Sequence, residues 1–212
     1  MKVFVDNDIA VKLAQWGLLQ RFSQHLIKQG SAELHGVHTL RYKFKLDQID
    51  KAAALVGSMN AARDLVAFAT LCKPVKSHDA AVAAALTEVP NIDAGEAALF
   101  AAAAHFDAVL VDTGDKKALR ALGGLGVGHV ASAALVGKVA CLEQTMHYLV
   151  GRWTFQSVHD AVVKVPDADR ATHSCFKGNP ESAALAALEA KVQELRPQCG
   201  GVLCDQPFSW IP

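Results

Sequence analysis

Along this chain, short apolar runs that stop at acidic residues alternate with longer segments of helical periodicity. Residues 3–5, Val-Phe-Val, end at Asp6, and residues 108–111 end at Asp112. Runs of this length and composition are typical of buried strands in a parallel sheet. Weaker strand signals lie at residues 34–37 and 127–131.

Apolar residues recur at helical spacing between these runs, so we expect a protein rich in helix. Gly17 is the expected break in the first such segment, which should form one or two helices. A capping box is expected where Asp93 begins a helix and Glu96 follows three residues later. Residues 41–45 are basic and fit a strand or a helix, with Thr39 as a candidate cap. The segments predicted to be helical are 9–27, 47–70, 78–86 (capped by Ser77), 93–105, 116–122, 133–150, 157–163 and 180–195.

This alternation predicts an α/β protein with a short central parallel sheet and helices on both faces. Near Gly137 the mixed strand and helix signals give way to helical ones. We therefore expect an α/β domain over residues 1–136 and a helical C-terminal extension over residues 137–212 that packs on this core. Residues 198–212 lack periodicity and should pack as an irregular strap.

Composition and charge limit the classes of partner. The 212 residues are 51% hydrophobic, which is enough for a buried core, and 21 basic residues balance 21 acidic ones. A molecule without net charge has no strong overall field, so nucleic acid or anionic lipid would need a local patch. The first apolar run is too short for a signal peptide and no run is long enough to span a bilayer, so a cytoplasmic protein is expected.

Five cysteines, an odd number, do not indicate a disulfide framework in a chain of this size. Cys175, Cys199, Cys204 and His173 have spacings that match known zinc motifs poorly. The sequence therefore gives little support to a zinc protein.

Acidic residues follow the two clearest strands, at Asp6, Asp8, Asp112 and Asp115. Ligands of parallel sheets bind beyond the carboxyl ends of the strands. Carboxylates gathered there repel one another unless a cation neutralises them, which favours Mg²⁺ or Mn²⁺. Such an ion suits phosphodiester hydrolysis, because it lowers the pKa of the attacking water and stabilises the leaving oxygen. Each acid also has a simpler interpretation, as the end of a strand or the cap of a helix.

Three segments in this order resemble the motifs of the PIN domain. They are Val3-Phe4-Val5-Asp6, Ile92-Asp93-Ala94-Gly95-Glu96-Ala97-Ala98 and Val109-Leu110-Val111-Asp112-Thr113-Gly114-Asp115-Lys116-Lys117. The resemblance covers residues 1–136 and implies a three-layer fold with a short parallel sheet between helices. PIN domains are largely metal-dependent ribonucleases, and many are toxins paired with an antitoxin. The resemblance thus implies Mg²⁺- or Mn²⁺-dependent cleavage of RNA, with RNA and an antitoxin protein as expected partners and a homo-oligomer as a further option.

Carried over position by position, the resemblance implies a catalytic set in which Asp6 is the first metal-binding aspartate. Glu96 matches the acid that opens the helix after the Gly-Glu-Ala step, and Asp115 matches the acid after the Thr-Gly turn. Asp8 and Asp112 are auxiliary metal ligands. The residues expected to contact the substrate are Thr113, Lys43 and Lys116. The basic residues of a candidate phosphate-contacting rim are Arg41, Lys43, Lys45, Lys116, Lys117 and Arg120.

One family element is missing from the sequence. The acid expected within residues 37–44 is replaced by Tyr-Lys-Phe at positions 42–44, although Asp47 or Asp50 can take its place if the match shifts by one helical turn. A lysine there changes the local charge by two units and can itself replace a cation. The alternative function is therefore a catalytically inactive PIN-like module that binds a protein or nucleic-acid partner.

Asp6-Asn7-Asp8 also fits the nucleophile and acid pair of a haloacid-dehalogenase-like phosphatase. That family places a second acid a few residues after a Gly-Asp pair. Here Gly114 and Asp115 are followed by Lys-Lys-Ala-Leu-Arg. The phosphatase therefore fits the sequence less well than the ribonuclease does.

Overall fold

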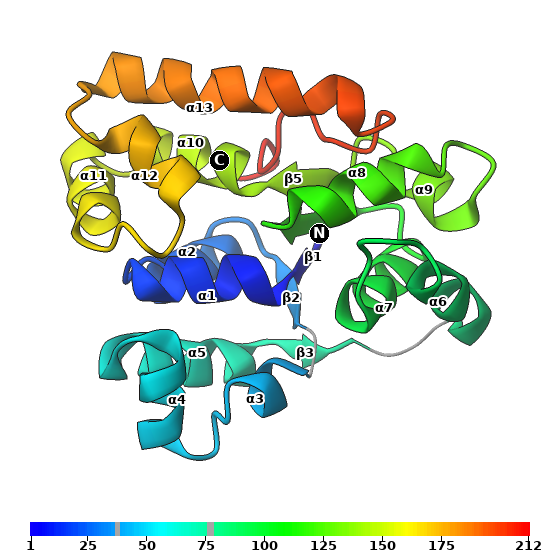
Figure 1. Ribbon diagram of the computed structural model, residues 1–212, viewed down its shortest axis with the longest axis horizontal. Helices are drawn as coiled ribbons and strands as arrows, with labels where there is room; N and C mark the ends of the chain where they lie inside the picture. The colour runs from blue at the N-terminus through cyan, green and yellow to red at the C-terminus, as the bar shows by residue number, and fades with distance from the viewer. Residues whose placement is uncertain (37–38, 76–78) are drawn as a thin grey trace.

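The structure is a computed structural model that describes residues 1–36, 39–75 and 79–212 (Figure 1). Within these residues five strands form one parallel sheet in the order β3-β2-β1-β4-β5. The strands are β1 (Lys2–Val5), β2 (Glu33–Gly36), β3 (Lys73–Pro74), β4 (Val109–Thr113) and β5 (Val139–Cys141). The central strand β1 pairs with β2 on one side and β4 on the other, and the apolar residues of β1 and β4 suit this buried position.

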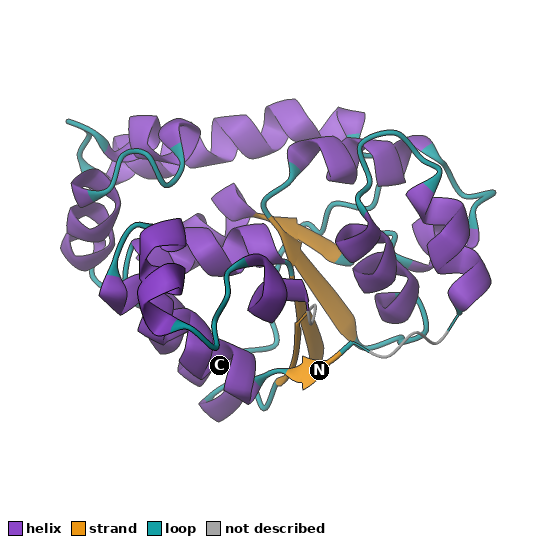
Figure 2. Cartoon of the chain, turned by 60° about the horizontal axis from the view of Figure 1, so that its bottom comes forward, coloured by secondary structure: helices purple, strands orange, loops and turns teal. Residues whose placement is uncertain are grey.

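Helices cover both faces of this sheet (Figure 2). The predicted α/β class, with a short parallel sheet between two helical layers, is confirmed. The α-helices of the described residues are α1 (Asn7–Gln15), α2 (Leu19–Lys28), α3 (Thr39–Lys43), α4 (Ile49–Val56), α5 (Met59–Leu71), α6 (Ala80–Thr87), α7 (Ala94–Ala103), α8 (Lys116–Gly124), α9 (Val130–Ala134), α10 (Leu142–Arg152), α11 (Phe155–Lys164), α12 (Arg170–Phe176) and α13 (Glu181–Leu195). A short 3₁₀ helix, η1 (Arg196–Gln198), follows α13.

Successive strand residues point to opposite faces, and the sheet therefore separates two apolar cores. Val3 and Val5 of β1 pack with α1, α2, α5 and α10 in the first core. Phe4 points the other way and packs with α7, α8 and the end of α13 in the second core. Burial on both faces explains why residues 3–5 of β1 and 109–111 of β4 are apolar in succession rather than at every second position.

The first helical segment divides as predicted, because Gly17 adopts a φ of 69° between α1 and α2. The single helix predicted over residues 47–70 is wrong, since α4 and α5 are separate there. Gly57 ends α4 with a φ of 90°, and the Ser58 hydroxyl then accepts a hydrogen bond from the Ala61 N–H, at 3.1 Å, to begin α5. The sequence signal for this break is Gly57 followed by Ser58, because the glycine ends one helix and the serine caps the next.

The strand predicted at residues 127–131 is also wrong. Helix α8 continues to Gly124, α9 follows, and β5 lies at 139–141, within the segment predicted to be continuous helix. Gly123 serves close packing rather than a loop, because a Cβ atom there would lie 2.1 Å from the Cys199 carbonyl oxygen. The absence of a side chain at Gly123 therefore lets the C-terminal tail approach α8.

Several further boundaries differ from the prediction. Residues 41–43 of the basic segment belong to α3, and residues 44 and 45 form a turn after it. Helix α6 is capped by Asp79, while the predicted cap Ser77, the predicted first residue His78 and the last residue of the 34–37 strand lie outside the described residues. β3 and α12 had no sequence signal strong enough to predict them.

The C-terminal segment contributes to the sheet and to both cores. β5 pairs with β4, and Val139 also forms a parallel bridge with Leu203 of the tail. Phe208 of the tail packs edge-on against Phe22 of α2, with ring centroids 5.6 Å apart. Residues 198–212 thus pack as the predicted strap. Among the described residues, no helix is long and apolar enough to cross a membrane.

Candidate functional site

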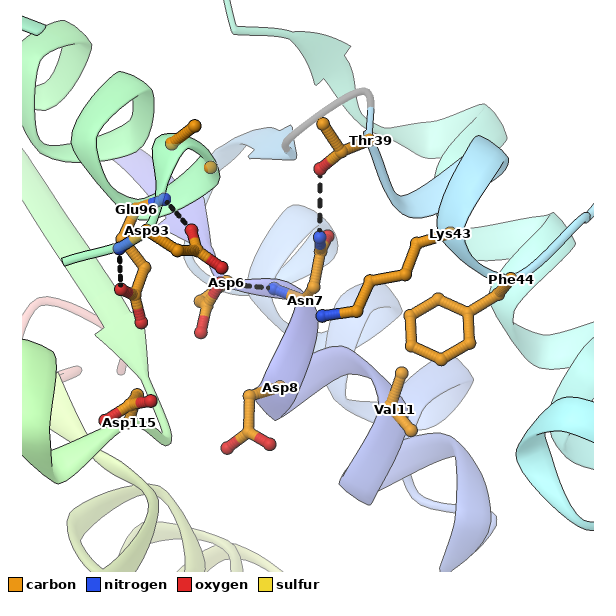
Figure 3. Close-up of a pocket in the computed structure, with 12 residues that line it drawn as sticks. Asp6, Asn7, Asp8, Val11, Thr39, Lys43, Phe44, Asp93, Glu96 and Asp115 are labelled. Carbon is orange, nitrogen blue, oxygen red and sulfur yellow. Dashed lines mark hydrogen bonds between the residues drawn. The ribbon is translucent and has the colours of Figure 1, made fainter. Parts of the chain in front are cut away.

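An acidic cavity of about 480 Å³ lies beyond the carboxyl end of the central strand (Figure 3). Carboxylates from three separate segments line it, and the basic side chain among its lining residues is Lys43 from α3. The lining carboxylates are Asp6, Asp8, Asp93, Glu96 and Asp115. The cavity therefore collects negative charge at the position where ligands of parallel α/β folds bind.

Asp6 is held at the junction of β1 and α1. Its N–H donates to the Asp112 carbonyl at 2.9 Å, its Oδ1 accepts from the Asn7 N–H at 2.7 Å, and its Oδ2 accepts from the Thr113 hydroxyl at 3.3 Å. The residue is 6% exposed. Burial, followed by the charge of Asp8, raises the pKa of Asp6 to about 6.

Glu96 lies in the first turn of α7 and forms the predicted capping box with Asp93 (Figure 3). Its Oε2 accepts from the Asp93 N–H and the Asp93 Oδ1 accepts from the Glu96 N–H, both at 2.8 Å. Burial raises the pKa of Glu96 to about 8, helped by the charges of Asp6, Asp93 and Asp115 and opposed by the Asp93 hydrogen bond. The charged form of Glu96 is therefore disfavoured mainly by burial, and repulsion from the neighbouring carboxylates adds to this.

Asp115 begins α8, where its Oδ1 accepts from the Lys117 N–H at 2.7 Å and from the Ala118 N–H at 3.1 Å. The N-termini of α1, α7 and α8 therefore all meet at the cavity, each begun by an acid that lines it. The partial positive charges of these helix ends offset part of the repulsion. Capping occupies one oxygen of each aspartate, and the second oxygen of Asp6 accepts the hydrogen bond from the Thr113 hydroxyl.

Asp8 lines the cavity from the first turn of α1. Its Oδ2 lies 2.6 Å from the Lys12 Nζ, which also lies 2.9 Å from the Oδ2 of Asp169, the cap of α12. Gly114 leaves room for this carboxylate, because a Cβ atom there would lie 2.0 Å from the Asp8 Oδ2 and the Asp8 side chain would have to move. The ion pair between Lys12 of α1 and Asp169 therefore links the C-terminal segment to the wall of the cavity.

Three residues predicted for the site lie outside the cavity lining. Asp112 is fully buried behind it and accepts a hydrogen bond from the Thr145 hydroxyl at 2.8 Å. Burial raises the pKa of Asp112 to about 8, although the Thr145 hydrogen bond opposes this. Thr113 is 1% exposed and uses its hydroxyl to orient Asp6. Lys116 turns away from the cavity and forms an ion pair with Glu143 of α10.

The opposite wall of the cavity is formed by α3, with Lys43 and Phe44 pointing inward (Figure 3). Asp47 and Asp50, the candidates for the missing acid, are exposed and do not line the cavity. The fifth carboxylate that lines the cavity is instead that of Asp93, which the sequence predicts only as a helix cap. The capping box was the available signal, because it holds Asp93 beside Glu96.

The donor set suits a hard divalent cation, because carboxylate oxygens are the ligands that Mg²⁺ and Mn²⁺ prefer. Within the described part of the chain, no three His, Cys, Asp or Glu side chains lie close enough together to hold a metal ion as placed. Mg²⁺ commonly keeps several waters and uses one or two carboxylates, so the cavity fits such an ion without a closed protein cage.

Comparison with known proteins gives no family for this chain: no family model, no curated protein and no solved structure matches it. The chemistry of the site is therefore inferred from its own residues.

Proposed function

We propose that the protein is a Mg²⁺- or Mn²⁺-dependent ribonuclease with a PIN-like fold, which hydrolyses RNA phosphodiester bonds in the acidic cavity. The observation that carries this proposal is the convergence of five carboxylates on one cavity. Burial and neighbouring charges raise the pKa of Glu96 to about 8, so the cavity carries a repulsion that a hard divalent cation would relieve.

In this proposal Asp6, Glu96 and Asp115 hold the ion, one or two of them directly and the rest through its bound waters, and Asp8 and Asp93 are auxiliary acids. When bound, the ion supplies an activated water and stabilises the oxygen that leaves the phosphate. The chain's own contribution is to fix the acids before substrate arrives, through helix caps and the hydrogen bond from Thr113 to Asp6. Lys43 lines the same cavity, where its charge can orient a substrate phosphate.

A second candidate is a non-catalytic PIN-like module that binds a partner through the same cavity. Two observations favour it: Lys43 lines the cavity where the family has an acid, and the described carboxylates form no ready group of three ligands. In that case the lysine itself offsets part of the acidic charge.

The decisive measurement is a calorimetric titration of Mn²⁺ into the parent, Asp6→Asn and Asp115→Asn. Asparagine also caps helices well, so both variants should remain folded. Asp167→Asn is a matched control, because Asp167 is exposed and pairs with Arg170 on the surface. The ribonuclease proposal expects binding in the parent and control that both site variants lose, together with RNA cleavage that EDTA abolishes.

Other results would select another function. Absence of Mn²⁺ binding and of RNA cleavage in the parent would contradict the ribonuclease and favour the partner-binding module. Hydrolysis of p-nitrophenyl phosphate with RNA left intact would instead favour the haloacid-dehalogenase-like phosphatase, in which Asp6 is the nucleophile.

A further inference from the structure

We propose that a second groove beside the acidic cavity binds the phosphate and base of a neighbouring nucleotide in a single RNA strand. This inference rests on the proposed ribonuclease function and adds a subsite to it. The groove has a volume of about 470 Å³ and lies between the α6–α7 connection and the outer face of α8. We call it the basic groove, and the residues that line it include Val89, Asn91, Lys117, Arg120 and Leu125.

The residues that line the basic groove and the acidic cavity are close neighbours along the chain on two segments. On one wall Asn91 of the groove precedes Asp93 of the cavity by two residues, and on the other Lys117 follows Asp115 by two. Arg120 lies about 7.5 Å further along the α8 axis than Asp115, since a helix rises about 1.5 Å per residue. A strand cleaved at the acids can therefore extend into the groove.

The two cations of the basic groove have no acidic partner in the part of the chain that the structure describes. Among the described residues, neither Lys117 nor Arg120 forms an ion pair, and both are exposed. The Arg120 Nε donates to the Gln198 Oε1 at 2.7 Å, and the Gln198 Nε2 donates to the Glu194 carbonyl at 2.7 Å. A neutral side chain thus orients the guanidinium while its charge stays available for an anion.

The two lysines at the start of α8 point in different directions. Lys116 pairs with the buried Glu143 of α10, whereas Lys117 lines the basic groove. The residue of this pair that can contact a phosphate is therefore Lys117 rather than Lys116, which the sequence had favoured.

The remaining surface of the basic groove is apolar. Val89 and Leu125 are partly buried and pack on the second core, so they present a fixed apolar surface below the cations. Asn91 adds an amide at a turn where its φ is 69°. Cations above an apolar surface complement a nucleotide, which offers a phosphate and a flat base together.

The test is binding of a fluorescein-labelled single-stranded RNA by anisotropy, in EDTA and over a series of salt concentrations. The variant is Lys117→Ala/Arg120→Ala. Its matched control is Lys164→Ala/Lys177→Ala, which removes the same charge from exposed sites on α11 and beyond α12. A charge-conserving variant, Lys117→Arg/Arg120→Lys, checks that the effect follows the charge.

The groove variant should bind RNA about tenfold more weakly than the parent. Its plot of log K against log salt should be less steep by about 1.4, because each phosphate contact to a single strand contributes about 0.7. The control and the charge-conserving variant should stay within about twofold of the parent. Circular dichroism of each variant shows that the fold is retained.

An unchanged affinity and salt slope in the groove variant would overturn the inference, as would a parent that binds no RNA. Tighter binding of polyglutamate than of RNA would also overturn it, in favour of an acidic protein partner. Because binding is measured without divalent metal, a parent that binds RNA through the groove but never cleaves it would refute the ribonuclease alone. Cleavage with an unchanged KM in the groove variant would refute the groove alone.

Discussion

Replacing Lys116 by methionine tests whether this lysine is a substrate residue or part of the protein's framework. Its ammonium group pairs with Glu143, whose side chain is 1% exposed, while the Lys116 side chain is 30% exposed. Removing one partner of a buried ion pair typically costs about 3–5 kcal/mol, because the other charge stays buried and uncompensated. Water reaches the lysine side, so we expect the lower end, about 3 kcal/mol.

Urea unfolding followed by circular dichroism measures this loss as a lower midpoint at an unchanged m-value. Lys116→Met/Glu143→Gln should recover most of the stability, because both charges are then absent. Lys117→Met is the matched control, and this exposed neighbour should change stability by less than about 0.5 kcal/mol.

A loss below about 1 kcal/mol in Lys116→Met, together with weaker RNA binding, would refute the reasoning. It would return Lys116 to the substrate-contacting role that the sequence indicated.

The remaining predictions concern pH, the basic residue of the cavity and the link to the C-terminal segment. Burial raises the pKa of Glu96 and Asp112 to about 8, so the metal-free folded state keeps protons that the unfolded chain releases near pH 4. The free energy of unfolding should therefore fall as pH rises from about 4 to about 8, and thermal unfolding that shows a rise would contradict this. Lys43→Glu should raise Mn²⁺ affinity in calorimetry by about tenfold, because it replaces a repelling charge by an attracting one, and an unchanged affinity would place the ion elsewhere. Asp169→Asn keeps the helix cap but removes the ion pair to α1, so urea unfolding should show a loss of about 1–2 kcal/mol. The exposed control Asp167→Asn should lose less than about 0.5 kcal/mol, and equal losses would show that the α1 link carries no stability.

The parts of the site that could be predicted are those fixed by chain direction. A run such as Val3-Phe4-Val5 has few ways to bury itself except as a strand, and the acid after it must then lie at the carboxyl edge. The Asp93 and Glu96 capping box likewise fixes a helix start within a residue. Four of the five predicted metal ligands share the acidic cavity for these reasons.

The parts that could not be predicted depend on where a side chain points. Asp112 lies within β4 rather than after it, so the alternation of the strand turns it toward α10. Lys116 and Lys117 differ by one helical step, and their roles separate only when Glu143 and the α6–α7 connection are placed around α8. β5 has only three residues, which are too few to show a periodic pattern of apolar positions.

The acids of the cavity have a consequence for the evolution of this protein. Asp6, Asp93 and Asp115 each begin a helix, so under the proposed ribonuclease function natural selection for folding alone would preserve them in a descendant that had lost that activity. Lys43 forms no ion pair among the described residues, and selection on stability places little constraint on it. In a set of descendants, the residue that records gain or loss of activity would be the one on α3, not the acids opposite.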